Sequence, residues 1–413
     1  MAQQMSPRQA GRRRFLRFSS ALSATALLAA CGQRGESRAP LPTPAASRTF
    51  DPTATATSTA TAVPSPTVSL VEKAGQMVLA GFRGLSVNAE SPIVRDLRES
   101  HVGGVILFSY DVPLASPVRN VASPAQLRTL VEQLHGFAPG PLIVAVDQEG
   151  GRVARLNEDY GFPATLSARE LASLGDLEQT RAHAGRMAET LATAGINVNL
   201  APVVDLRDPD NPVIGALDRS FSADPLVVIE RARAFIQGHH DHGVRCALKH
   251  FPGHGSSKAD SHLGFVDVTA TWTNADLQPF AALVEGGFAD SVMTAHIFNG
   301  TIDPVLPATL SRATVQDLLR QSLGFEGVVF SDDLQMGAIR EHYGFDEAIE
   351  LAVQAGVDIM IFGNNLVYDE GAPGRAVATI VRLVEDGRIS MARLDESYGR
   401  ITRFKEGLLQ AQP

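Results

Sequence analysis

The sequence predicts a (β/α)8 barrel of the TIM type, and three observations lead to that prediction. Short apolar segments alternate with amphipathic segments from Leu70 onward, as expected of a parallel α/β domain. About eight such strand-and-helix units are expected over this length, which is the number that closes a barrel. Polar residues directly follow several of the apolar segments, and barrels carry their functional groups at the carboxyl ends of the strands.

The apolar runs are predicted to be the strands of the barrel. Each is continuous and lacks the alternation of a half-exposed strand, which is typical of parallel strands covered by helices. In order along the chain, the predicted strands are residues 76–81, 104–108, 142–146, 197–202, 246–250, 292–296, 328–331 and 359–362.

Two of the predicted helices have recognisable ends or faces. Residues 225–242 follow Asp224, a suitable N-cap, begin with Pro225 and stop before Gly243. Residues 391–409 place apolar side chains at the spacing of one helical face. A doubly wound sheet is the alternative fold, but it usually has a glycine-rich phosphate turn, which Glu149-Gly150-Gly151 does not match.

Residues 1–31 are predicted to be a lipoprotein signal peptide. Arg12 and Arg13 fit a twin-arginine export pattern, and the apolar run 18–30 is shorter than the roughly 20 residues that span a bilayer. The run ends at Leu28-Ala29-Ala30-Cys31, which is similar to a bacterial lipobox. We therefore expect an exported protein, lipid-anchored through Cys31 to the outer face of a bacterial membrane. A secretory peptide with an incidental cysteine is the alternative.

The segment 32–69 is predicted to be a disordered linker, and residues 70–413 the barrel. Pro, Thr, Ala and Ser dominate the linker, so it buries too little apolar surface to offset its conformational entropy. A glycosylated stalk would have the same composition. The chain has 413 residues, a net charge of -9 and 2 cysteines. The acidic balance argues against nucleic acid as a partner, and lipidation of Cys31 would leave Cys246 unpaired.

Three motifs carry the ionisable residues that follow the predicted strands. They are VDQEGGRVAR at 146–155, KHFPGHGSSKADSH at 249–262 and FSDDLQM at 330–336. Glycosidic cleavage needs a carboxylate facing the anomeric carbon and an acid that protonates the leaving oxygen. Both kinds of group are present in the motifs.

In this order and spacing, the motifs resemble the family 3 glycoside hydrolases, in particular the single-domain bacterial β-N-acetylhexosaminidase branch. The resemblance implies a retaining exo-β-N-acetylglucosaminidase, which cleaves terminal N-acetylglucosamine from cell-wall or other glycans through a covalent glycosyl-enzyme. It implies no cofactor and no metal, and we expect a monomer whose partners are the glycan and the membrane. A β-glucosidase or a glycoside phosphorylase of the same family is the alternative.

The resemblance assigns Asp332 as the nucleophile, because the family places it at the first Asp after the Ser. Asp333 is the competing carboxylate, and either residue could instead cap the next helix. The acid/base is assigned to His262 with Asp260 as its partner. A histidine titrates near neutrality, which suits a group that donates and then accepts a proton. Without the resemblance, Asp260-Ser261-His262 would be read as a polar turn.

Further residues are expected to bind the sugar, again because of the resemblance. They are Asp147, Arg155, Arg219, Lys249 and His250. Ion pairing at the barrel mouth is the alternative role for Lys249 and Arg155. Ser222 stands where the family more often has Gly, a departure that concerns the local turn. Glu149 and Arg152 are expected to be structural, and His254 and His296 have no assigned role.

Two other classes of function remain open on the sequence. A metal-dependent hydrolase would use the several histidines as ligands, but no ligand follows the first strand and Lys249 would repel a cation. The cluster from His239 to His242 is expected to be a solvated helix end. A non-catalytic sugar-binding lipoprotein would share the signal peptide and linker, but binding alone does not require Asp332, Asp260 and His262 together.

Overall fold

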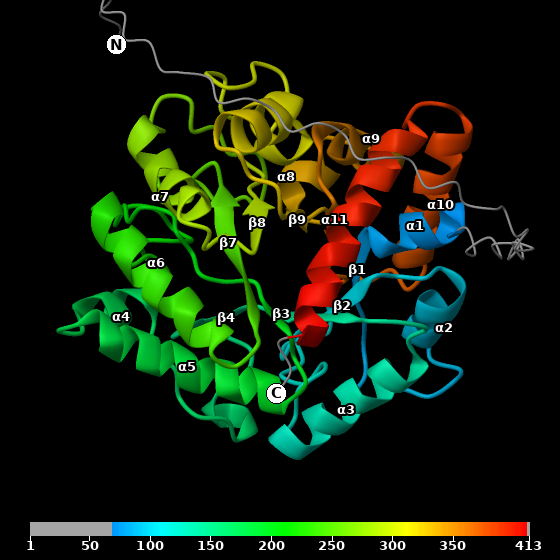
Figure 1. The fold of residues 1–413 in the computed structure, drawn as a ribbon, viewed down its shortest axis with the longest axis horizontal. Helices are drawn as coiled ribbons and strands as arrows, with labels where there is room; N and C mark the ends of the chain where they lie inside the picture. The colour runs from blue at the N-terminus through cyan, green and yellow to red at the C-terminus, as the bar shows by residue number, and fades with distance from the viewer. Residues whose placement is uncertain (1–67, 411–413) are drawn as a thin grey trace, which may run out of the picture. The chain divides into compact units, whose positions relative to one another are not determined.

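The computed structural model describes residues 68–410, and its centre is a closed barrel of parallel strands (Figure 1). The barrel closes where Val78 pairs with Met360. The predicted fold is confirmed. The barrel strands are β1 (Val78–Gly81), β2 (Gly104–Leu107), β3 (Ile143–Val146), β6 (Val198–Asn199), β7 (Arg245–Phe251), β8 (Ser291–Thr294), β9 (Val328–Asp333) and β10 (Ile359–Phe362).

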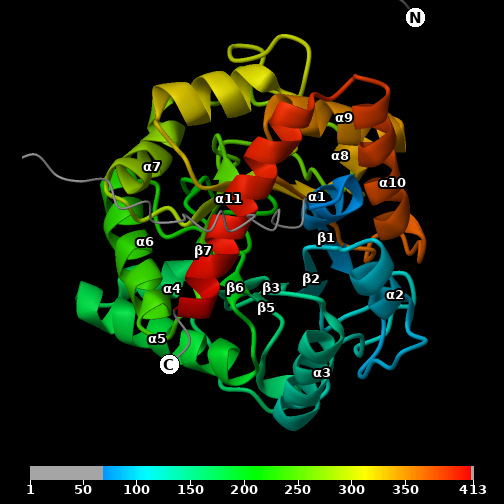
Figure 2. The same ribbon diagram turned by 45° about the vertical axis from the view of Figure 1, so that its right-hand side comes forward.

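Helices connect the strands and surround the barrel (Figure 2). They are α1 (Leu70–Gln76), α2 (Pro92–Glu99), α3 (Pro124–Phe137), α4 (Ala168–Ser173), α5 (Leu177–Thr193), α6 (Pro225–His240), α7 (Asn274–Glu285), α8 (Gly337–Arg340), α9 (Phe345–Ala355), α10 (Ala372–Glu385) and α11 (Met391–Gln410). A π-helix, η3 (Ala313–Ser322), precedes β9, and short 3-10 turns lie at η1 (Glu158–Tyr160) and η2 (Ala308–Leu310). A small hairpin, β4 (Gln148–Gly150) with β5 (Val153–Ala154), follows β3.

Local sequence explains the predicted helix ends. The side chain of Asp224 accepts a hydrogen bond from the backbone N–H of Leu226, which caps α6.

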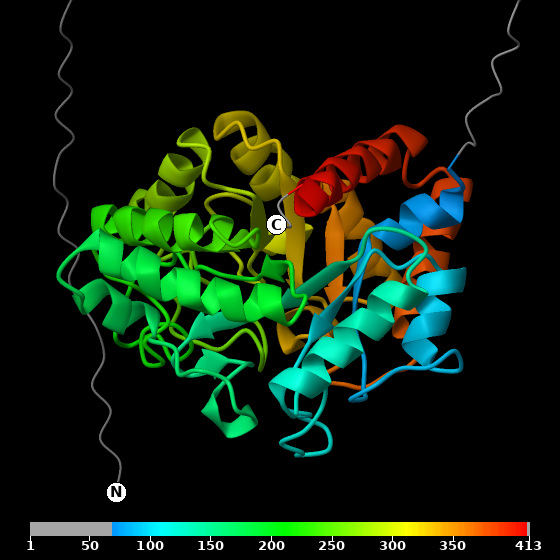
Figure 3. The same ribbon diagram turned by 60° about the horizontal axis from the view of Figure 1, so that its bottom comes forward.

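Figure 3 shows α6 beside α5. The close approach of the two helices requires Gly238, because a Cβ there would lie 2.5 Å from the carbonyl oxygen of Arg181. Helix α11 lies across the end where strands begin, since Lys405 donates to the carbonyl oxygen of Pro141, just before β3.

The strands are buried on both faces, as their continuous apolar runs predicted. Every residue of β1, β2, β3 and β10 is buried. One apolar cluster includes the barrel interior and the side chains between strands and helices. This core makes the carboxyl ends of the strands a rigid base for the side chains that follow them.

The structure differs from the predicted strands at several ends, and three of them bear on the site or its surroundings. Gln76 ends α1 instead of starting β1. The strand predicted at 197–202 is reduced to β6, and Pro202, which has no N–H to donate to the ladder, lies beyond its end. Strand β9 extends through Asp333, and the next helix begins only at Gly337. The alternative that Asp332 and Asp333 cap a helix is therefore wrong.

The predicted signal peptide with Cys31, and the linker up to residue 67, lie outside the described residues. Within the described part, no helix combines the length and apolar character needed to cross a bilayer. Helix α1 begins at Leu70, capped by the side chain of Ser69, near the predicted start of the barrel.

Candidate active site

The predicted site residues come together at the carboxyl ends of the barrel strands. Asp147 follows β3, Lys249 and His250 lie at the end of β7, and Asp332 lies near the end of β9. The other predicted residues are on segments that follow β5, β6 and β7, namely Arg155, Arg219, Asp260 and His262. The predicted site residues therefore lie at the end of the barrel where such barrels carry their functional groups.

A cavity of about 270 Å³ lies at this end of the barrel. Its charged or titratable walls are Asp147, Arg155, His262, Asp332 and Asp333. Its other walls are mostly apolar, including Ile106, Phe108, Tyr110, Val112, Leu200, Met293, Met336, Ile361 and Leu366. A small number of polar groups among apolar walls is the usual composition of a small-molecule site.

A buried lysine links two of the carboxylates at the base of the site. Lys249 is 2% exposed, and its Nζ lies 2.7 Å from Asp147 Oδ1 and 2.7 Å from Glu149 Oε1. Arg219 donates two hydrogen bonds to Glu149, at 2.7 and 2.8 Å. Burial opposes ionisation of Glu149, yet Arg219 and Lys249 hold its pKa well below the ordinary value. The cluster is therefore ionised and compensated.

Glu149 is ion-paired with Arg219 and Lys249, which is consistent with the structural role expected for it. The positions of the predicted sugar-binding residues relative to the cavity differ. Lys249, His250 and Arg219 do not line the cavity, whereas Asp147 and Arg155 do. Arg155 lies 3.4 Å from Asp147 Oδ2. Arg152, also expected to be structural, is exposed and is not a wall of this cavity.

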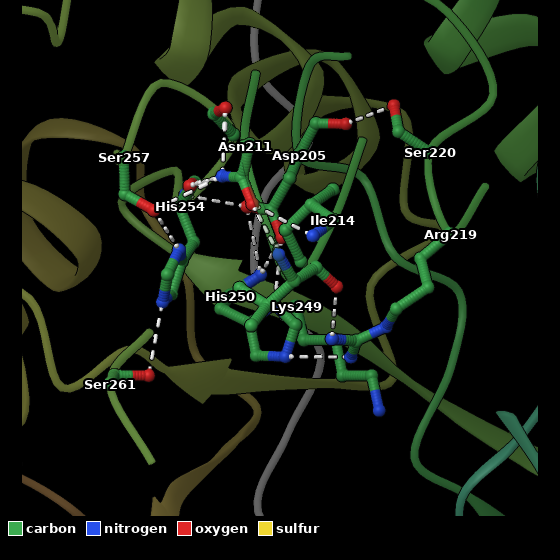
Figure 4. Close-up of polar contacts among 12 residues, drawn as sticks. Asp205, Asn211, Ile214, Arg219, Ser220, Lys249, His250, His254, Ser257 and Ser261 are labelled. Atoms are coloured by element: carbon green, nitrogen blue, oxygen red, sulfur yellow. Dashed lines mark hydrogen bonds and ion pairs between the residues drawn. The ribbon is translucent and has the colours of Figure 1, made fainter. Parts of the chain in front are cut away.

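A second buried carboxylate, Asp205, organises the histidine motif after β7 (Figure 4). Its Oδ2 lies 2.7 Å from His250 Nδ1, and its Oδ1 accepts from the backbone N–H of His254 at 2.7 Å. The pKa of Asp205 is lowered despite complete burial, because His250 and His254 stabilise its charge. With Nδ1 directed at Asp205, the His250 ring keeps Nε2 toward Arg219, at 3.4 Å.

The two neighbouring aspartates of β9 have different environments. Burial opposes the charge of Asp332, but His296, His250 and His262 lower its pKa to about 2. Burial raises the pKa of Asp333 to about 6, although its carboxylate accepts from the backbone N–H groups of Gln335 and Gly363. Asp332 accepts a single backbone hydrogen bond, from the N–H of Asp333 at 2.8 Å, whereas Asp333 accepts two. Asp332 is thus the more strongly ionised carboxylate of the pair and the one with more oxygen lone pairs left for a ligand.

The Asp260–His262 pair is present as the resemblance implied. Asp260 Oδ1 accepts from the backbone N–H of His262 at 2.9 Å and lies 2.8 Å from His262 Nδ1. The side chain of His262 is 47% exposed and lines the cavity. Because Nδ1 faces the carboxylate, Nε2 is the ring nitrogen that remains for a ligand.

Sequence reasoning missed Asp205 and the apolar walls of the cavity. Asp205 follows β6 in the run Pro202-Val203-Val204-Asp205, so the rule that polar groups after strands are functional could have found it. Phe108 and Tyr110 also follow β2, but an apolar side chain such as Phe108 gives no signal of this kind. His296, which had no assigned role, donates from Nε2 to the carbonyl oxygen of Asp333 at 2.9 Å and so holds the end of β9.

One expectation about histidines is wrong. His239 was expected on a solvated helix end, but it is completely buried, stacks on Phe235 and lies 2.9 Å from Asn199 Nδ2. The helix turns this one side chain inward, against the barrel. Among residues 68–410, no group of three or more His, Cys, Asp or Glu side chains forms a metal-binding set.

The architecture and the order of the site residues can be compared with known proteins. The family model described as "Glycosyl hydrolase family 3 N terminal domain" matches residues 69–404. This chain belongs to glycosyl hydrolase family 3. The family resemblance drawn from the three motifs is thereby confirmed, and the matched range includes every predicted site residue except Cys31.

Relatives and solved structures in family 3 agree with this assignment. The "Beta-hexosaminidase" of Xylella fastidiosa (strain M23) is 41% identical over 339 residues, which cover 79% of this chain and 96% of the relative. The "Beta-hexosaminidase" of Alkalilimnicola ehrlichii is 37% identical and is covered to 88%.

Two solved structures extend the comparison to three dimensions. A family 3 β-N-acetylglucosaminidase from Paenibacillus sp. superposes with a TM-score of 0.76 at 36% identity, covering 83% of this chain and 63% of that one. The β-N-acetylhexosaminidase from Beutenbergia cavernae superposes with a TM-score of 0.74 at 32% identity, covering 82% of this chain and 99% of that one. This family 3 chain thus covers nearly all of the Beutenbergia cavernae protein, but 63% of the longer Paenibacillus protein.

Proposed function

We propose that this family 3 protein is a retaining exo-β-N-acetylglucosaminidase. The observation that carries the proposal is that ionised Asp332 and His262 line the same cavity, and that His262 already has a carboxylate partner in Asp260. These are the two groups that glycoside hydrolysis through a covalent intermediate requires. The names of the relatives, "Beta-hexosaminidase" and β-N-acetylglucosaminidase, support the choice of sugar.

The geometry supports a two-step reaction. In the first step a carboxylate oxygen of Asp332 bonds to the anomeric carbon while the bond to the leaving oxygen breaks, and His262 Nε2 protonates that oxygen. In the second step neutral His262 takes a proton from water, whose oxygen displaces Asp332 from the anomeric carbon. Asp260 holds the His262 tautomer and stabilises the ring when it is charged.

Two of the other predicted residues contact the sugar in this proposal, and the remaining three support them from outside the cavity. Asp147 and Arg155 line the cavity and contact ring hydroxyls in the proposal. Lys249, His250 and Arg219 complete the site from behind these groups. Each has a buried acidic partner, so none is left uncompensated when the sugar is absent.

A trapping experiment tests the nucleophile. A slow fluorinated N-acetylglucosaminyl substrate should accumulate as a glycosyl-enzyme, and peptide mass spectrometry should find the sugar on Asp332. A sugar on Asp333 would overturn the assignment. Retention of anomeric configuration, followed by NMR, is the accompanying expectation.

The alternatives are separated by a panel of aryl glycosides. We expect hydrolysis of the β-N-acetylglucosaminide in preference to the β-glucoside, with no dependence on phosphate and no loss with a chelator. A preference for glucoside supports a β-glucosidase, and a requirement for phosphate supports a phosphorylase. Chelator-sensitive turnover supports a metal-dependent hydrolase, and binding without turnover supports a non-catalytic lipoprotein.

We also propose that the enzyme works at the outer face of a bacterial membrane, on glycans of the cell wall. The support is the lipobox that ends at Cys31 and the pair Arg12-Arg13, both outside the described residues. Cys31→Ser should move the protein from the membrane fraction to the soluble exported fraction without changing activity on an aryl substrate. Unchanged membrane association would contradict the anchor. Size-exclusion chromatography of the Cys31→Ser protein tests the proposed monomer.

A further inference from the structure

The residue between the two members of the Asp260–His262 pair points the opposite way. Ser261 is 2% exposed, whereas the side chains of Asp260 and His262 are 28% and 47% exposed. The segment therefore directs its middle side chain into the protein while the pair on either side faces the cavity or solvent. The hydroxyl of Ser261 is the buried attachment point of the loop.

That hydroxyl meets His254, a residue of the same motif that the proposed reaction does not use. His254 Nε2 lies 3.1 Å from Ser261 Oγ, and Nδ1 lies 3.0 Å from Ser257 Oγ (Figure 4). One ring thus joins two serines on the loop that carries the pair. Figure 4 shows the ring lying between these serines.

The ring is itself fixed to the barrel. The backbone N–H of His254 donates to Asp205, which also binds the His250 ring at the end of β7. The backbone carbonyl of His254 accepts from Asn211 Nδ2 at 2.8 Å, and the same Nδ2 lies 3.1 Å from Ser257 Oγ. His254 is therefore a rigid support for the loop. The loop is also held by backbone contacts to α8, such as that from the Ala338 N–H to the carbonyl oxygen of Ser261, and at the surface by the ion pair of Lys258 with Asp208.

The chemistry of the ring suits two hydroxyl partners. Burial, and then the neighbouring charge of His250, lower the pKa of His254 to about 4, so the ring is neutral at ordinary pH. A neutral imidazole has one donor and one acceptor nitrogen, and a serine hydroxyl can serve either. Both bonds can therefore form at the same time in either tautomer.

We propose that His254 and Ser261 form a latch that positions the Asp260–His262 pair over the cavity. Both are positioning residues and neither touches the substrate. The proposal rests on the proposed role of His262 as acid/base. Opening the latch leaves Asp332 and the sugar-binding residues in place, but it reduces the fraction of time that His262 Nε2 lies beside the leaving oxygen.

The test compares Ser261→Ala, Ser261→Thr and His254→Gln with a matched control, Ser291→Ala. Ser291 is a buried serine outside the site, and its hydroxyl donates to the carbonyl oxygen of Cys246 at 2.8 Å. Each variant is assayed as kcat/KM on two aryl β-N-acetylglucosaminides, one with an activated leaving group and one with a poor one. An activated leaving group needs little protonation, so it is insensitive to a displaced acid.

For Ser261→Ala we expect a fall of about 10-fold on the poor leaving group, which corresponds to one hydrogen bond, and less than about 3-fold on the activated one. Ser261→Thr keeps the hydroxyl and should restore most of the loss, while Ser291→Ala should match the wild type on both substrates. The double variant His254→Gln/Ser261→Ala should have a kcat/KM no lower than that of the less active single variant, because both changes remove the same contact.

Hydrogen exchange separates failure of the latch from failure of the proposed function. Ser261→Ala should speed exchange in residues 256–265 and leave the barrel strands unchanged. Unchanged exchange in that loop overturns the latch, as does an equal loss on both substrates or the same loss in Ser291→Ala. If the loop exchanges faster but His262→Ala has no leaving-group dependence, the latch stands and the acid role of His262 falls.

Discussion

At the scale of single residues, the charges of the site are set by buried partners rather than by solvent. Lys249 lies between Asp147 and Glu149, and the pKa of each of these two carboxylates is lowered although burial alone would raise it. Buried charges of this kind are tolerated only as compensated groups. Removing one member therefore affects stability as well as binding.

We expect Lys249→Met to lower the free energy of unfolding by about 3–5 kcal/mol at neutral pH, because it leaves Asp147 buried without its main partner. The pKa values of Asp147 and Glu149 are lower in the folded protein than in the unfolded chain, where carboxyl groups have pKa values of about 4. The wild type therefore keeps the stability from this pairing at pH values above about 4, and loses it as the pH falls further. In the variant, burial favours protonated Asp147, so the deficit should shrink as pH falls toward about 4.

Urea unfolding at a series of pH values measures this difference. A deficit that stays constant with pH would contradict the account. The control is Lys258→Met, because Lys258 is half exposed and pairs with Asp208 at the surface. That variant should change stability little at any pH, since exposed pairs are screened by solvent.

The two aspartates of β9 provide a second prediction. Asp332→Asn should lower kcat by about 10⁴-fold or more, because the amide is not a nucleophile. Asp333→Asn should retain most activity. Its carboxyl has a pKa raised to about 6, so the charged form costs stability above that pH and the amide should be at least as stable at neutral pH.

Steady-state kinetics and thermal unfolding of both variants check this. An inactive Asp333→Asn with an active Asp332→Asn would reverse the assignment. Equal and large losses of stability in both would show that the two side chains share a structural role instead.

At the scale of elements, the site is built by loops that follow strands and by the short helices that support them. The loop carrying Asp260 and His262 rests on the start of α8, where the backbone N–H of Gly337 donates to the carbonyl oxygen of His262. This contact is possible because residue 337 has no side chain. A Cβ there would lie 2.8 Å from that oxygen and 3.0 Å from the carbonyl carbon of Leu263.

Gly337→Ala should therefore displace the loop and lower kcat/KM by about 10- to 100-fold, because small misplacements of a catalytic group are costly. Stability should change little, since alanine favours a helix more than glycine does. The control is Gly136→Ala in α3, where a Cβ meets nothing within 4 Å. Kinetics that stay at the wild-type level in Gly337→Ala would show that the loop adjusts freely.

At the scale of the whole molecule, the two ends of the barrel have different tasks. The carboxyl ends of the strands carry the cavity, whereas a buried carboxylate before β10 ties several elements together. Asp358 accepts from Arg320 at 2.6 Å, from Arg393 at 3.4 Å and from Arg400 at 3.2 Å, and so joins η3 and α11 to the barrel. It also accepts from the backbone N–H of Val329.

We expect Asp358→Asn to lower the free energy of unfolding by about 3–5 kcal/mol, because three arginines lose their common anion. KM should not change, since the network lies at the opposite end of the strands from the cavity. Denaturant unfolding and steady-state kinetics below the transition measure both effects. The control, Asp346→Asn, removes an exposed partner of Arg382 and should cost less than about 1 kcal/mol. A raised KM in Asp358→Asn would show that the two ends are coupled.

The sequence by itself determined the barrel and the family. Apolar runs and helical periodicity are local properties, so residues such as those at 359–362 predicted their strand without any knowledge of neighbours. Motif order along the chain is also local, and it placed Asp147, Lys249 and Asp332 at strand ends. The family match confirmed what those motifs predicted.

Only the tertiary structure decided how the site residues are partnered. Lys249 and Asp147 are separated by 102 positions, and Asp205 reaches His250 across 45, so no local pattern indicates these pairs. Neighbouring histidines distinguished Asp332 from Asp333, although both are buried. Packing turned His239 inward and directed Ser261 toward His254. The physical reason is that charge and hydrogen bonding inside a protein depend on groups that folding brings from distant parts of the chain.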